Sequence, residues 1–167
     1  MKINISNLSE GTHDYQLSKK SEEIGLESNF FGDVRAWITL EKVRRQLFVK
    51  AKISGQAHVE CARCLDPFDR EFISKFRIVY VQDEEEYLGG NEEEVRILHH
   101  DTNIIDLSDD VKDFMLLSVP LKLVCSEDCE GLCPRCGRKI ETGHDAACIQ
   151  KETEIDSRWN KLRDLKQ

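Results

Sequence analysis

The sequence lacks the features that would place it in a membrane or a secretory pathway. It contains no run of about 18 apolar residues, so no membrane-spanning helix is expected. Its opening residues, MKINISNLSEG, have no apolar stretch of the kind that secretory signals carry. We therefore expect a cytoplasmic protein with no membrane partner.

The sequence also lacks the short motifs of the common catalytic classes. It has no glycine-rich phosphate-binding loop, no GxSxG nucleophile turn and no HExxH metalloprotease motif. Acidic residues are abundant, but they gather in runs, which is more typical of a solvated surface than of a paired catalytic acid and base. The sequence therefore predicts a protein that is not an enzyme.

Charge is distributed unevenly along the chain. The formal net charge of −8 argues against simple nucleic-acid binding by the whole surface. Residues 83–94 carry seven acidic side chains and no basic one, whereas residues 34–77 hold ten Lys or Arg against five Asp or Glu. A basic sheet face beside an acidic loop is one interpretation of this pattern, and an ordinary solvated surface is the other.

Alternating apolar residues predict a sheet in the first half of the chain. Apolar side chains recur at every second position over 34–40 and 47–61, and a further strand follows over 72–80. Gly55 interrupts the second stretch and predicts a bulge or bend. Shorter strands are expected around Ile3 and around Tyr15. Turn residues between these stretches favour an antiparallel meander.

The second half has a different periodicity. Apolar residues follow helical spacing over 107–118, and Asp109 and Asp110 suit the positive end of that helix. The fold class we predict is α+β, with a curved antiparallel sheet or partial barrel, one main helix and a zinc-stabilised Cys-rich C-terminal segment. The expected regions are a strand region with the first CxxC at 1–81, an acidic loop at 82–103, and at 104–167 the helix, the metal-binding segment and a short C-terminal helix.

Seven cysteines are the densest chemistry in the sequence. Two pairs have CxxC spacing, Cys61 with Cys64 and Cys133 with Cys136, and Gly137 follows the second pair. A CxxC turn directs two thiolates and several backbone N–H groups toward one centre, which is typical of a zinc knuckle. In a reducing cytosol, clustered cysteines bind metal more often than they form disulfides.

Structural zinc takes four ligands, and the seven cysteines plus one histidine make eight, so one or two zinc ions are expected. In one arrangement, two sites form from Cys133, Cys136, His144 and Cys148, and from Cys61, Cys64, Cys125 and Cys129. Other arrangements remain open: one local site from Cys125, Cys129, Cys133 and Cys136, a ribbon uniting the two CxxC pairs, or no tightly bound metal. Thioredoxin-like redox chemistry is disfavoured, because neither CxxC opens a helix in a βαβ unit.

Basic residues in the strand region predict a nucleic-acid surface. Alternate residues of an extended strand share a face, so Lys50 and Lys52 point the same way, as do Lys75 and Arg77. The candidate RNA-binding residues are Arg44, Arg45, Lys50, Lys52, Lys75 and Arg77. The competing interpretation is that these cations serve solubility.

Three motifs, CARCLDPF, LLSVPLKLVCSEDCEGLCPRCG and DSRWNKLRDL, resemble the YceD-type family of large ribosomal RNA subunit accumulation proteins. The chain departs from the family pattern in two places. His144 and Cys148 replace the usual C-x-C pair, and Ser157 replaces the usual proline of the last motif. Histidine can replace cysteine as a zinc ligand.

The resemblance implies a role in the synthesis, processing or stability of large-subunit ribosomal RNA, with no known enzymatic activity. We therefore expect a non-enzymatic ribosome-biogenesis factor whose partner is large-subunit ribosomal RNA or a nascent ribosomal protein. The alternative is a structural zinc module that docks a protein partner without contacting RNA. Nothing in the sequence predicts an oligomeric state.

Overall fold

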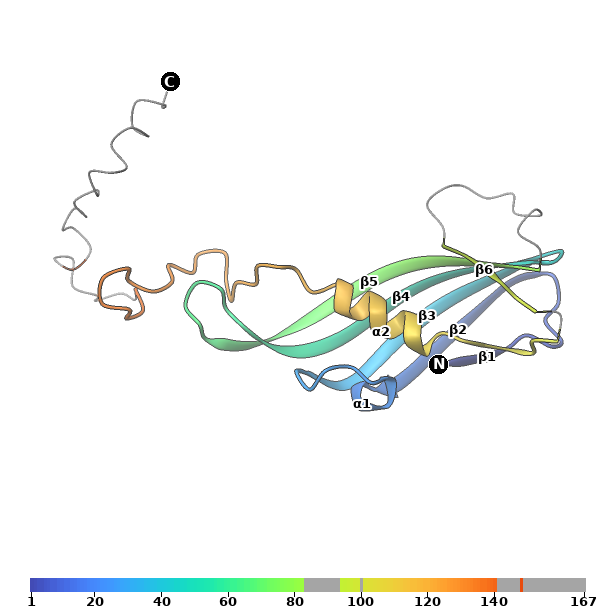
Figure 1. The fold of residues 1–167 in the computed structure, drawn as a ribbon, viewed down its shortest axis with the longest axis horizontal. Helices are drawn as coiled ribbons and strands as arrows, with labels where there is room; N and C mark the ends of the chain where they lie inside the picture. The colour runs from blue at the N-terminus through green and yellow to red at the C-terminus, as the bar shows by residue number, and fades with distance from the viewer. Residues whose placement is uncertain (83–93, 100, 141–147, 149–167) are drawn as a thin grey trace, which may run out of the picture.

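The computed structural model describes residues 1–82, 94–99, 101–140 and 148 (Figure 1). The described elements follow in the order β1 Lys2–Asn4, β2 Gly11–Lys20, α1 Ser21–Ile24, β3 Phe30–Val43, β4 Gln46–Glu60, β5 Pro67–Val81, β6 Glu94–Ile97, β7 Ile104–Asp106 and α2 Ser108–Leu117. Most of the acidic run, His144 and the expected C-terminal helix lie outside these residues. The described part of the chain is mostly sheet with one main helix.

The larger sheet has the strand order β2-β3-β4-β5-β6. Strands β2 to β5 form the expected antiparallel meander, with Ile38 opposite Ala51 and Ala51 opposite Phe76. Strand β6, in contrast, pairs with β5 in parallel. Residues 82–93 join these two strands, and a connection of about a dozen residues is long enough for a parallel crossover. In the described part, β2 and β6 are not paired with each other, so the sheet is open.

Each long strand buries one side and exposes the other over most of its length, because successive side chains point to opposite faces, and the end of β5, residues 78–81, is buried on both sides. In β3 the alternate residues Val34, Ala36, Ile38 and Leu40 are at most 1% exposed. A bulge was expected at Gly55 in β4. The irregularity instead lies in the partner strand β3, opposite Gly55, where the register shifts between Phe31 and Arg35. Gly55 itself faces α2, and a β-carbon there would lie 3.4 Å from the Met115 sulfur.

A second layer covers the apolar face of the sheet. The short β1–β7 ribbon, α1 and α2 supply it, and α2 lies across the long strands (Figure 1). Leu107, Val111 and Met115 are fully buried in this layer, and the ring of Phe114 stacks on Phe76 at 4.6 Å. The predicted helix over 107–118 is confirmed. Removal of this apolar surface from water holds the layers together.

A buried ion pair connects β6 to α2. The Nη2 atom of Arg96 lies 2.5 Å from Oδ1 of Asp110, whose side chain is 2% exposed. Burial raises the pKa of Asp110, although the guanidinium opposes this effect. This pair anchors the short strand that follows the acidic region.

Candidate metal centre

The tip of the β4–β5 hairpin, residues 61–66, forms the first CxxC turn. Within it, the N–H of Leu65 donates to the carbonyl of Cys61, and the N–H of Cys61 donates to the carbonyl of Asp66, both at 2.9 Å. The N–H of Arg63 points at the Cys61 sulfur at 3.4 Å. Leu65 has φ of 62°, a left-handed conformation that closes the turn at a residue with a side chain.

The second turn, residues 133–138, has the same backbone pattern. The N–H of Gly137 donates to the carbonyl of Cys133 at 2.9 Å, and the N–H of Cys133 donates to the carbonyl of Arg138 at 2.7 Å. Gly137 has φ of 67°, close to that of Leu65 at the corresponding position. The two CxxC pairs are therefore two copies of one local structure.

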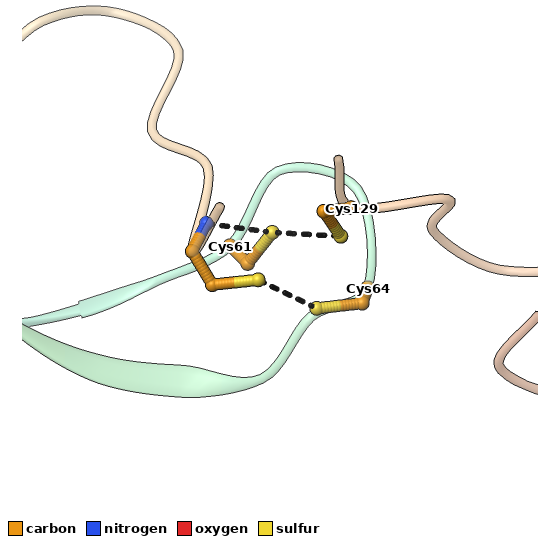
Figure 2. Close-up of side chains that lie close together, drawn as sticks. Cys61, Cys64 and Cys129 are labelled. Carbon is orange, nitrogen blue, oxygen red and sulfur yellow. Dashed lines mark hydrogen bonds between the residues drawn. The ribbon is translucent and has the colours of Figure 1, made fainter. Parts of the chain in front are cut away.

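Cys125 and Cys129 complete the first cluster. They come from the segment after α2 and lie against the hairpin tip, where Figure 2 shows Cys61, Cys64 and Cys129 converging. The four sulfur atoms lie within 4.8 Å of one another, with 3.8 Å between those of Cys61 and Cys129 and 3.7 Å between those of Cys64 and Cys125. Tetrahedral zinc with Zn–S bonds of about 2.3 Å places its sulfurs about 3.8 Å apart. The first cluster therefore fits such an ion.

Electrostatics in the first cluster favour a cation at its centre. Backbone N–H groups, that of Cys64 foremost, lower the pKa of the Cys61 thiol to about 6 against the effect of burial. The Asp66 N–H acts to lower the pKa of the Cys64 thiol. Burial and the three neighbouring thiols together outweigh this effect and raise that pKa to about 12. The four thiols thus resist becoming four thiolates together, and a divalent ion removes that repulsion.

The second cluster contains Cys133, Cys136 and Cys148. Their sulfur atoms lie within 4.8 Å of one another, and those of Cys133 and Cys148 are 3.6 Å apart. Its expected fourth ligand, His144, lies outside the described residues. In the described part of the chain, Cys125 and Cys129 group with the first CxxC and not with the second. The clusters can each hold a metal ion, and its identity as zinc stays a prediction.

Backbone contacts join the two turns. The Arg63 guanidinium donates to the carbonyls of Glu127 at 3.0 Å and Cys129 at 2.8 Å, and the Arg63 carbonyl accepts from Leu132 N–H at 3.1 Å. Asp66 and Lys139 form an exposed ion pair across the same junction. This role of Arg63 was not predicted from the sequence, although an arginine precedes the second cysteine in both CxxC pairs.

The candidate RNA-binding residues separate into two places. Lys50 lies opposite Arg77 and Lys52 lies opposite Lys75, all on the side of the sheet away from α2. With Trp37 they are among the residues that border a hollow of about 620 Å³, which Phe76, Glu94 and Phe114 of α2 also line, and we call these five residues the basic face. Arg44 and Arg45 instead form the β3–β4 turn, beside a different hollow of about 230 Å³.

Trp37 was not among the sequence-based candidates. Its side chain is 38% exposed, and the Lys52 ammonium lies 5.8 Å from the centre of its ring. The signal was its position in the alternation, because Trp37 stands between the core residues Ala36 and Ile38 and so belongs to the polar side of β3. RNA binding by these residues stays a prediction.

Comparison with curated proteins identifies relatives in mycobacteria. A Mycobacterium bovis protein and a Mycobacterium tuberculosis protein, both named only as uncharacterised, are 31% identical over 131 residues, which cover 77% of this chain and 59% of theirs. An uncharacterised Mycobacterium leprae protein is 26% identical over 138 residues, covering 77% of this chain and 57% of its own. The chain thus spans less than two thirds of these relatives. No solved structure matches it.

No helix in the described ranges has the length and apolar content needed to cross a membrane. Residues 49–166 match the family described as large ribosomal RNA subunit accumulation protein YceD. The match begins in β4 and includes both thiol clusters. Because it covers more than half of the 167 residues, the chain belongs to the YceD family.

Proposed function

We propose that this protein is a non-enzymatic factor of the cytoplasm that supports the synthesis, processing or stability of large-subunit ribosomal RNA. The observation that carries the proposal is the family match over residues 49–166, since the family is named for accumulation of that RNA. The partner we propose is the large-subunit RNA or a nascent ribosomal protein.

Zinc is the metal that best suits the two clusters. The first set of ligands is all thiolate, and its sulfur spacing matches a tetrahedral ion. Bound there, zinc supplies a cross-link between the hairpin tip and the segment after α2. The four-thiolate set leaves no ligand position for water, which supports a structural role for this ion.

A protein-docking role without RNA contact is the second candidate. It is favoured by two exposed leucines that precede Cys125 in the chain: Leu117, at the end of α2, is 77% exposed, and Leu121 is fully exposed. Apolar side chains in this position suit a protein partner better than a phosphate backbone.

Depletion of the protein in its own organism tests the proposed function. We expect the ratio of large-subunit to small-subunit ribosomal RNA to fall, and expression of the parent protein to restore it. Cys64→Ser should restore the ratio only partly, because it removes a ligand of the first cluster. An unchanged ratio after complete depletion contradicts the proposed function.

A further inference from the structure

We propose that the basic face binds single-stranded RNA, with a base stacked on Trp37 and phosphates held by the surrounding cations. This inference rests on the proposed function, because it assigns the RNA contact of that function to one surface. The cations are Lys50, Lys52, Lys75 and Arg77. Arg44 and Arg45 are not part of the surface, since they lie at the β3–β4 turn.

Sheet register concentrates these side chains in two adjacent rows. Trp37, Lys52 and Lys75 form one row across β3, β4 and β5, and Thr39, Lys50 and Arg77 form the next. Neighbouring strands lie about 4.8 Å apart, and successive rows on one face lie about 6.8 Å apart. Four cations and an indole ring therefore share a patch only about 10 Å wide.

Like charges lie in direct opposition on this patch. Lys50 faces Arg77, and Lys52 faces Lys75. Cross-strand pairs of equal charge are destabilising, so two such pairs in succession are not what solubility alone requires. A chain of phosphates offsets this repulsion because it brings regularly spaced negative charge.

Carboxylates in the part of the chain that the structure describes do not neutralise the patch. Within the described residues, none of its four cations forms an ion pair. Glu94 borders the hollow, but Arg96 binds its carboxylate at 2.8 Å. Asp14, on the same side of the sheet, accepts a hydrogen bond from Thr39 at 2.7 Å. The positive charge is therefore available to an external anion.

The exposed indole decides which anion fits. Base stacking on an aromatic side chain suits unpaired nucleotides, since the bases of a duplex are already stacked on each other. The Lys52 ammonium lies over the Trp37 ring, 5.8 Å from its centre. The flexible Lys52 side chain can turn toward a phosphate when a base stacks on the ring instead. An acidic peptide matches the charge but carries a flat ring only at its aromatic residues, whereas every nucleotide pairs a phosphate with a base, so RNA is favoured over protein.

Fluorescence anisotropy tests this inference. It measures the binding of a labelled 12-nucleotide single-stranded RNA to the metal-loaded protein at several salt concentrations. Trp37→Ala should weaken binding about 10-fold or more, while Trp37→Phe keeps most of the affinity. Neutralising the four cations to glutamine should reduce the slope of log affinity against log salt by about 0.7 for each phosphate that the protein no longer neutralises. A duplex of the same length should bind more weakly.

Matched controls separate the patch from overall charge. Lys112→Gln with Lys122→Gln changes two cations on and just after α2, on the opposite layer, and should leave the salt slope unchanged. In a Trp159→Phe background, Trp37 is the only tryptophan, so RNA should quench its fluorescence directly. Should Trp37→Ala fail to fold, Trp37→Leu gives the same comparison.

Equal affinity for duplex and single strand, together with full binding by Trp37→Leu, overturns the inference. So does crosslinking from position 37 that captures a ribosomal protein and no RNA. Introducing Trp37→Leu into depleted cells distinguishes this failure from failure of the proposed function. If that variant restores the ribosomal RNA ratio fully, the surface is wrong and the function stands. If depletion never changes the ratio, the function is wrong, whatever the binding result.

Discussion

The backbone oxygen of Arg63 lies 3.0 Å from the position that a β-carbon on Gly131 would occupy. The two segments therefore meet at a distance that only glycine allows without displacement. The same oxygen accepts the N–H of Leu132 at 3.1 Å, so the approach is also a hydrogen-bonded junction. It fixes the chain between the two thiol clusters onto the hairpin tip.

We expect Gly131→Ala to lower the free energy of unfolding more than Gly137→Ala. Both glycines have left-handed backbones, with φ of 82° and 67°, where a side chain costs about 1–2 kcal/mol. Only Gly131 meets a neighbouring backbone as well, since a β-carbon at Gly137 would meet nothing within 4 Å. Urea denaturation of the metal-loaded variants measures the difference. Equal losses would show that the close approach contributes nothing.

Arg63→Ala should increase hydrogen exchange in residues 123–140 and leave exchange in β3 unchanged. The guanidinium holds two carbonyls of that segment, at 3.0 and 2.8 Å, and alanine holds neither. Arg63→Lys should give an intermediate result, because an ammonium lacks the planar fork of arginine. Arg70→Ala removes an exposed arginine of β5 and serves as the control. Exchange that is identical in all four proteins contradicts this role of Arg63.

Protein purified without chelator should contain one or two zinc ions per chain. Cys64→Ser should remove the ion of the first cluster, and Cys136→Ser the ion of the second, because each loses a thiolate ligand. Elemental analysis against protein concentration measures both. Cys136→Ser should also loosen the second turn, residues 133–138, while the strands within 1–80 keep their protection. Less than half an equivalent of zinc in the parent protein would overturn the metal assignment.

Asp110 should make stability depend on pH in the direction opposite to most carboxylates. Its folded-state pKa is raised above 3.8 by burial, so the native state binds its proton more tightly than the unfolded state. Its contribution to the free energy of unfolding therefore falls as pH rises from about 4 through the raised pKa. Above that pKa, the contribution is constant.

Comparison with Asp110→Asn isolates this contribution, because both proteins share every other titrating group. We expect the stability of the parent, measured relative to the variant by urea denaturation, to decrease between about pH 4 and the raised pKa. An increase over that interval would mean that the pair with Arg96 outweighs the cost of burial.

The long strands and the main helix were predictable because each buries one continuous side. Val34 to Leu40 alternate between core and solvent, and Val111 and Met115 repeat at helical spacing, so local sequence and tertiary packing agree. The parallel pairing of β6 was not predictable. That strand has only four residues, and its position depends on the distant contact between Arg96 and Asp110.

Cysteine spacing gave the ligand types but left their partition open. Four arrangements were compatible with the same residues, because the partner of each CxxC pair is fixed by contacts such as that between Arg63 and Cys129, which spacing does not encode. The position of Trp37 among the basic residues was not predicted for a related reason. Alternation places Trp37 on the polar side of β3, but only the cross-strand register shows that Lys52 lies beside it there.

Pairing of β4 with β5 runs unbroken from the basic face to the hairpin tip. Eight residues separate Lys52 from Glu60, a length of about 27 Å along the strand. The hydrogen-bonded pairs of such a hairpin open successively from its end. Loss of a bound metal ion would therefore open the pairs at the tip well before those at Lys50 and Lys52. Under the proposals made above, the metal clusters and the basic face are therefore expected to bind independently, so that loss of zinc would open the hairpin tip and leave the affinity of the basic face for RNA unchanged.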